Sequence, residues 1–80
     1  MRDDLIVVPV FSTGREGPTR VMLSARSTGL RHDSIAFCDE VTTIDRDFLF
    51  RGPVGTLSKS LVEAVVRGVR RALGDVVAEP

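Results

Sequence analysis

The sequence has few of the residue types on which several classes of site depend. It contains one cysteine, one histidine, no tryptophan and no tyrosine in 80 residues. One cysteine cannot close a disulfide within the chain, and one cysteine with one histidine cannot complete an ordinary zinc site. The sequence therefore predicts a domain that is stabilised by neither a disulfide nor a metal.

Motifs for nucleotide cofactors, metals and membranes are also missing. The chain has no G-x-G-x-x-G or G-x-x-x-x-G-K-[ST] loop, no H-E-x-x-H and no calcium-binding loop. It has no run of 18 apolar residues, and Pro9 interrupts the N-terminal apolar stretch, so neither a membrane span nor a signal peptide is indicated. We expect a cytoplasmic protein that uses no cofactor.

Charge is balanced overall but unevenly distributed along the chain. Eleven basic side chains match 11 acidic ones, and ten of the basic residues are arginines. Residues 37–50 carry one arginine against four carboxylates (net −3), whereas residues 51–74 carry five basic side chains against one acidic (net +4). Arginine suits phosphate binding and base stacking better than lysine does. The chain can thus present a basic face, although the arginine bias is explained more simply by codon composition.

Length and composition indicate one small globular domain over residues 1–80. Hydrophobic residues make up 42% and charged residues 28% of the sequence, which is ordinary for a folded domain. Folding of a chain of this size buries only about 60% of the surface that the unfolded chain exposes, so a single small core adds little stability. A partner subunit would therefore help it.

The first two thirds of the chain is predicted to form strands. Leu5–Phe11 is a β-branched run that contains a proline, which places it at a sheet edge. Ser12–Pro18 has turn residues and joins that run to Thr19–Arg26, whose alternation is typical of a half-buried antiparallel strand. A third strand is expected over Ser34–Thr43 and a short fourth one at Phe48–Phe50.

The pattern becomes helical after Ser58. Apolar side chains recur every three or four residues on one face, and arginines occupy the remainder. Ser58 is the expected N-cap, and Gly74 is placed to be the left-handed residue after the helix. Strands followed by a helix predict an α+β fold in which the helix lies on a small, bent antiparallel sheet or partial barrel.

Several side chains are candidates for chemistry. Asp39 lies in line with apolar strand positions, where a buried carboxylate needs a partner or acquires a raised pKa; a strand-end salt bridge is the alternative. Ser12 and Thr13 directly follow an apolar strand, a common place for catalytic hydroxyls and for turn formers alike. His32 is predicted to be a solvated loop residue, and Cys38 a small buried one.

Four segments occur in an order and spacing that is more specific than any of them alone. They are Val7–Ser12, similar to V-V-P-V-T-S; Gly29–Leu30 with Ser34–Glu40, similar to S-x-x-x-x-D-Q; Thr43–Arg46; and Pro53–Ser58. Together they resemble the PemK/MazF/Kid family of toxin ribonucleases from bacterial toxin–antitoxin modules. The resemblance covers most of the chain and implies a bent, SH3-like partial barrel with a C-terminal helix.

The resemblance also implies an activity and partners. Family members are homodimers that cut single-stranded mRNA at short sequences without a metal, and they bind an antitoxin with an acidic tail. Ser12 matches the serine of V-P-V-T-S, and Asp39 matches an aspartate in the active groove of some members. The candidate catalytic residues are therefore Ser12, Asp39 and Thr13, and the candidates for RNA contacts are Arg15, Arg20, Arg31 and His32.

Two departures from the family pattern support a second hypothesis. Phe11 stands where the family has threonine, and the upstream arginine-proline motif of longer members is not in this sequence, as if the N-terminal part were lacking. The alternative function is a catalytically degenerate module that binds an antitoxin or a toxin subunit. A start internal to a longer reading frame is a third possibility.

Overall fold

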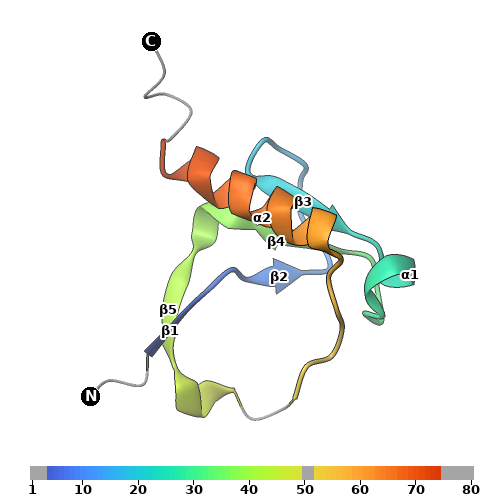
Figure 1. Ribbon diagram of the computed structural model, residues 1–80, viewed down its shortest axis with the longest axis horizontal. Helices are drawn as coiled ribbons and strands as arrows, with labels where there is room; N and C mark the ends of the chain where they lie inside the picture. Colours follow the sequence, from blue (N-terminus) through green and yellow to red (C-terminus); the bar gives the residue numbers. More distant parts are fainter. Residues whose placement is uncertain (1–3, 50–51, 75–80) are drawn as a thin grey trace.

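The computed structural model describes residues 4–49 and 52–74. It contains two antiparallel sheets and a long helix near the C-terminus, so the α+β prediction is confirmed (Figure 1). The strands and helices, in chain order, are β1 (Asp4–Val7), β2 (Val10–Phe11), β3 (Arg20–Leu23), α1 (Ala25–Thr28), β4 (Ser34–Phe37), β5 (Thr42–Asp45) and α2 (Lys59–Ala72). Two 3₁₀ turns, η1 (Cys38–Glu40) and η2 (Arg46–Phe48), flank β5.

Two segments of the chain each contribute a strand to both sheets: the segment with β1 and β2, and the segment with β4 and β5. The smaller sheet pairs β1 with β5, and the larger one has the order β2-β4-β3. The chain therefore passes from one sheet to the other twice, between β1 and β2 and again between β4 and β5. In the described residues the sheets form a bent surface and do not close into a barrel (Figure 1).

Both bends fall where a single strand was expected, and each has a physical reason. Leu5–Phe11 is divided at Val8–Pro9 because proline has no N–H to donate to a ladder. The Pro9 carbonyl instead accepts a 2.9 Å bond from the Phe37 N–H. Ser34–Thr43 is divided by the η1 turn, which buries Cys38 between β4 and β5.

Two other expectations about strands are wrong. The strand predicted over Thr19–Arg26 ends at Leu23, because the Ser24 hydroxyl accepts from the Ser27 N–H and begins the short helix α1. Of the strand expected at Phe48–Phe50, the described residues Phe48 and Leu49 form no strand: Phe48 ends η2, whose N-cap is the Asp45 carboxylate. Phe50 lies outside the described residues.

The helix prediction is confirmed at both ends. The Ser58 hydroxyl accepts a 3.2 Å bond from the Leu61 N–H, so Ser58 is the N-cap of α2. Gly74 has φ of 85°, and its N–H donates to the Arg71 carbonyl at 3.0 Å, which ends the helix as expected. In the described part of the chain no helix is both long and apolar enough to cross a bilayer.

The core lies between α2 and the larger sheet. Leu23, Ala36 and Cys38 are almost completely buried, and partly buried side chains of β3, α2 and three connecting segments pack around them. The list of those neighbours is Val8, Val21, Leu30, Leu57, Leu61, Val65 and Val69. Burial of Cys38 confirms that it acts as a small apolar core residue.

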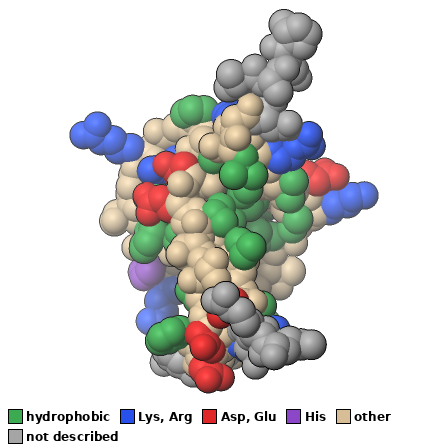
Figure 2. Space-filling model, turned by 90° about the vertical axis from the view of Figure 1, so that its left-hand side faces the viewer, with side chains coloured by type: hydrophobic (Ala, Val, Ile, Leu, Met, Phe, Trp, Pro, Cys, Tyr) green, Lys and Arg blue, Asp and Glu red, His purple; other side chains and the backbone are tan. Residues whose placement is uncertain are grey.

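The smaller sheet is much less covered than the larger one. Ile6 on β1 is 77% exposed, and Phe48, in the η2 turn after β5, is 68% exposed. Figure 2 views the molecule from the β1 and β5 side and shows hydrophobic side chains at the surface of that face, between charged ones. A chain with this surface leaves apolar area for a partner to cover.

A close contact between Gly68 and Cys38 sets the distance of α2 from the sheet. A methyl group added at Gly68 would lie 2.7 Å from the Cys38 sulfur and 3.0 Å from its Cβ. Gly68 and Cys38 are both buried, so the helix would have to move away from the core to make room for the methyl group.

We expect Gly68→Ala to lower the free energy of unfolding by about 1–3 kcal/mol, the usual cost of overpacking. At an unconstrained helical position the same substitution would raise it by about 1 kcal/mol. The measurement is urea-induced unfolding, with Gly68→Ala also made in a Cys38→Ala background, where the sulfur is absent. The double variant should lose less unfolding free energy than the sum of the losses in the two single variants. A Gly68→Ala variant that is more stable than wild type would contradict this account of the packing.

Candidate functional site

One group of candidate residues is organised by Arg20, the first residue of β3. Its Nε donates to Asp39 Oδ1 at 3.0 Å, and its Nη2 donates to Asp39 Oδ2 at 3.2 Å. Nη2 also lies 3.8 Å from a carboxylate oxygen of Glu40. The arrangement is the two-bond fork that the planar guanidinium favours with a carboxylate. It fixes the η1 turn to β3.

Aromatic rings complete this group. The guanidinium carbon of Arg20 lies 3.8 Å from the centroid of the Phe37 ring, a cation–π distance. Phe11 packs against Phe37 edge to face, with ring centroids 5.0 Å apart and an interplanar angle of 78°. The strand register explains this meeting, because Arg20 pairs with Phe37 and Phe11 pairs with Ile35 on one face of the sheet.

The loop after β2 lies against the Phe37 ring. Gly14 has φ of 148°, and a Cβ added there would stand 2.5 Å from the Phe37 ring. Arg20 Nη1 donates to the Arg15 carbonyl at 3.4 Å, which holds the loop from the other side. We call Phe11, Arg15, Arg20, Phe37 and Asp39 the Arg20 cluster.

The ion pair decides the protonation of the Asp39 carboxyl. The hydrogen bonds from Arg20 lower the pKa of Asp39 below its ordinary value, and those bonds outweigh the partial burial that would raise it. The pKa of Arg20 is raised by the same partner. Of the two expectations for Asp39, the salt bridge at a strand end is therefore what the structure shows, and a raised pKa is wrong.

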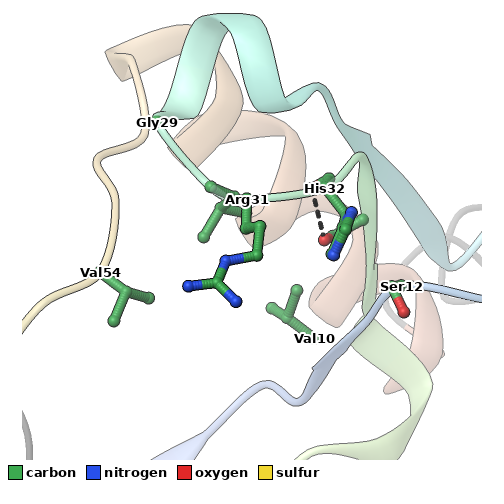
Figure 3. Close-up of a pocket in the computed structure, with 8 residues that line it drawn as sticks. Val10, Ser12, Gly29, Arg31, His32 and Val54 are labelled. Carbon is green, nitrogen blue, oxygen red and sulfur yellow. Dashed lines mark hydrogen bonds between the residues drawn. The ribbon is translucent and has the colours of Figure 1, made fainter.

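A second group of candidates surrounds a pocket of about 800 Å³ on the other side of β2. Figure 3 shows the Arg31 side chain pointing into this pocket between Val10 and Val54, with His32 on the side of Ser12. Ser12 comes from the end of β2, and Arg31 and His32 come from the connection between α1 and β4. We call this the Arg31 pocket.

Local hydrogen bonds shape the connection that carries Arg31 and His32. Gly29 ends α1 with φ of 79°, a conformation that glycine adopts without strain. The Asp33 carboxylate accepts a 2.8 Å bond from the Ala25 N–H, and Ser34 Oγ donates to the His32 carbonyl at 3.0 Å. These bonds tie both ends of the connection to α1 and β4.

The structure thus places six of the seven residues proposed from sequence in two groups. Arg15, Arg20 and Asp39 belong to the Arg20 cluster, and Ser12, Arg31 and His32 line the Arg31 pocket. Thr13 lies on the exposed turn next to Ser12. The two groups adjoin at the end of β2, where Phe11 belongs to one and Ser12 to the other.

Ser12 and Asp39 are not brought together. Ser12 follows the Phe11–Ile35 pair and lines the same pocket as Ser34, the first residue of β4, whereas Asp39 lies beyond Phe37, the last residue of β4. Ser34 and Phe37 are three residues apart along β4, a distance of about 10 Å. Ser12, His32 and Asp39 therefore do not form a catalytic triad of the Ser-His-Asp type. Within residues 4–49 and 52–74, no three His, Cys, Asp or Glu side chains are grouped so as to hold a metal ion.

Sequence reasoning missed the aromatic part of the Arg20 cluster. Phe11 and Phe37 are 26 positions apart, and nothing in the local sequence pairs them. The available signal was the alternation of side chains along each strand, since residues two apart share a face. That signal identifies contacts between strands only when the pairing of β2, β3 and β4 is known.

The ion pair predicts how stability depends on pH. Because the folded pKa of Asp39 is depressed, its contribution is complete above the unfolded pKa of about 3.9 and is lost as pH falls through the lower folded value. The unfolding free energy of wild type should therefore exceed that of Asp39→Asn at pH 6, and the gap should shrink below about pH 4. Urea unfolding from pH 3 to 7 measures it.

Asp47→Asn, which changes an exposed aspartate on η2, is the matched control. It should track wild type more closely than Asp39→Asn does at pH 6. The assignment of the ion pair would be contradicted if the difference in unfolding free energy between wild type and Asp39→Asn stayed constant or grew as the pH falls below about 4.

Comparison with known proteins identifies the family. Residues 2–73 match the model of the PemK-like, MazF-like toxins of type II toxin–antitoxin systems. The chain is similar to the solved Mycobacterium tuberculosis toxin MazF-mt6, with a TM-score of 0.79 and 29% identity over 90% of this chain and 71% of that one. A second solved Mtb toxin gives a TM-score of 0.79 and 30% identity over 88% of this chain and 75% of that one.

An endoribonuclease from mycobacterial species shares the fold, with a TM-score of 0.74 and 21% identity over 90% of this chain and 65% of that one. A comparison with curated protein sequences gave no match. The family match extends from β1 through α2, and it includes both the Arg20 cluster and the Arg31 pocket. The chain belongs to the PemK-like, MazF-like family of type II toxin–antitoxin toxins.

Proposed function

We propose that the chain is an endoribonuclease toxin that cleaves single-stranded mRNA at short sequences without a metal ion. The observation that carries the proposal is the junction of the Arg20 cluster and the Arg31 pocket at Phe11 and Ser12. Cationic, hydroxyl and imidazole side chains from distant parts of the sequence lie around one edge of the larger sheet there. A strand of RNA that crosses this edge would contact both groups.

The reaction is an internal transfer at phosphorus. The ribose 2′-oxygen attacks the adjacent phosphorus and gives up its proton, while the bond from phosphorus to the 5′-oxygen breaks and that oxygen takes a proton. The products are a 2′,3′-cyclic phosphate and a 5′-hydroxyl. The site must exchange two protons and stabilise extra negative charge on the phosphoryl oxygens.

The Arg31 pocket contains groups suited to these tasks. The Arg31 guanidinium points into the pocket, where it can bind a phosphate oxygen with two parallel N–H donors (Figure 3). Ser12 offers a hydroxyl donor to a second oxygen. His32 lies beside them, and histidine is the side chain that most often takes and gives protons near neutral pH.

The Arg20 cluster has a positioning role in this proposal. Both Asp39 oxygens accept from Arg20, and a carboxylate with a lowered pKa is a weak base for a ribose hydroxyl. Asp39 therefore acts through Arg20, which it holds over Phe37 and against the Arg15 carbonyl. Arg15 and Thr13 lie on the same loop as Ser12 and would contact the RNA backbone on that side.

Two partners belong to the proposal. An antitoxin follows from the toxin–antitoxin family, and Arg15 and Arg31 would attract its acidic tail. We also expect a homodimer, because apolar side chains such as Ile6 are exposed on β1 and a chain of 80 residues has little core of its own.

The proposal is tested by cleavage of a long single-stranded RNA in EDTA. Loss of one phosphate-binding donor at such a site costs about 100- to 1,000-fold in rate, so Ser12→Ala and Arg31→Ala should each be slower by that order. Arg67→Ala, which removes an exposed arginine of α2, is the matched control and should cleave within about twofold of wild type. Circular dichroism confirms that each variant is folded.

Intact RNA after incubation with folded wild-type protein would contradict the proposal. The alternative function, a catalytically degenerate module that binds an antitoxin or a toxin subunit, would then remain. The exposed ring of Phe11 in place of the family's threonine favours that alternative. It predicts binding of an acidic antitoxin peptide or a full-length toxin without cleavage.

A further inference from the structure

Phe11 carries an aromatic ring that is exposed at the edge of the candidate site. We propose that this ring stacks against an unpaired base of the RNA next to the bond being cut, and so helps to determine where the RNA is cleaved. The inference rests on the proposed ribonuclease function. It assigns a base-binding position to a residue that neither phosphate binding nor proton exchange requires.

The ring has room for a base. Phe11 is 47% exposed although its ring packs on Phe37. Rings at 78° to each other touch through an edge of one and a face of the other, so Phe37 covers at most one face of Phe11. A planar base can therefore approach the other face, and every base has such a face to offer.

The ring is also held in place before anything binds. Phe37, which supports it, has the Arg20 guanidinium 3.8 Å from its centroid and the backbone of Gly14 against its far end. The forked bonds to Asp39 keep Arg20 there. A preorganised platform loses little freedom on binding, so more of the stacking energy appears as affinity.

The place of Phe11 in the sheet fits a base beside a bound phosphate. Phe11 and Ser12 are neighbours, about 3.8 Å apart at Cα, and their side chains lie on opposite sides of β2. β2 is an edge strand of the larger sheet, so no strand of the described chain blocks a path around it. A phosphate at Ser12 and a base on Phe11 can thus belong to the same or adjacent nucleotides.

The surroundings of Phe11 favour RNA over a protein partner on this face. Thr13 and Arg15 are exposed next to it, and Arg20 lies behind its support. Among the described strand residues that the register places on this face, the exposed large apolar ones are Phe11 and Met22, which is a small apolar area. Protein interfaces usually need a larger continuous area.

The test measures binding separately from cleavage. The probe is a set of short single-stranded RNAs in which every ribose is 2′-O-methylated, so that the 2′-oxygen cannot attack, and in which one base at a time is 2-aminopurine. Wild type should quench the fluorescence at one position, where the base stacks. Phe11→Leu should abolish this quenching and weaken binding by about 5- to 150-fold, the range for one base stacked on an aromatic side chain.

Phe11→Trp should restore both signals, and Phe48→Leu is the matched control. Phe48 is an exposed phenylalanine on η2 that belongs to neither the Arg20 cluster nor the Arg31 pocket, and its replacement should leave binding and quenching unchanged. On ordinary RNA, Phe11→Leu should still cleave, with an altered distribution of cut positions. Thermal unfolding and sedimentation report whether each variant is folded and in which oligomeric state.

The outcomes separate this inference from the proposed function. Folded Phe11→Leu that binds, quenches and cuts like wild type overturns the role of Phe11 and leaves the ribonuclease proposal intact. A Phe11→Leu variant whose oligomeric state changes while its RNA binding does not shows that the ring contacts protein, which also overturns it. If wild type neither binds nor cleaves RNA, both proposals fail.

Discussion

The close approach of α2 to the η1 turn is the contact on which the other features depend. Gly68 lets the helix reach the buried Cys38, and this closes the small core over the inner face of β3 and β4. Because α2 holds the η1 turn in place through Cys38, the neighbouring Asp39 can bind Arg20 at the outer face of the sheet. The ion pair, the edge-to-face rings and the loop against Phe37 are consequently all built on a packing contact between two residues that carry no charge.

The helix and the fold class could be predicted from the sequence because their signals are local. An apolar period of three to four residues, a serine at the start and a glycine at the end are sufficient to define α2. The strands were predicted less well. Continuous β-branched runs extend through Pro9 and through Cys38, and periodicity alone does not reveal that the chain changes sheets there.

The candidate site divides in the same way. The identity of individual residues, such as Ser12 and Asp39, was available from a motif. Their grouping was not, since it depends on the pairing of β2, β3 and β4 and on the hydrogen bonds around α1. The same pairing explains why an aspartate in line with apolar positions has a lowered pKa: its partner, Arg20, comes from a strand 19 residues earlier.

In the proposed function, the side chains of the Arg31 pocket promote attack of a ribose 2′-oxygen on the neighbouring phosphate. The most direct measurement is the chemistry of the new RNA ends after incubation in EDTA, with a matched RNA that carries a single 2′-deoxyribose at the cut position. The account predicts a 2′,3′-cyclic phosphate and a 5′-hydroxyl, and no cut at the deoxyribose. A 5′-phosphate end, or cleavage at the deoxyribose, would contradict it.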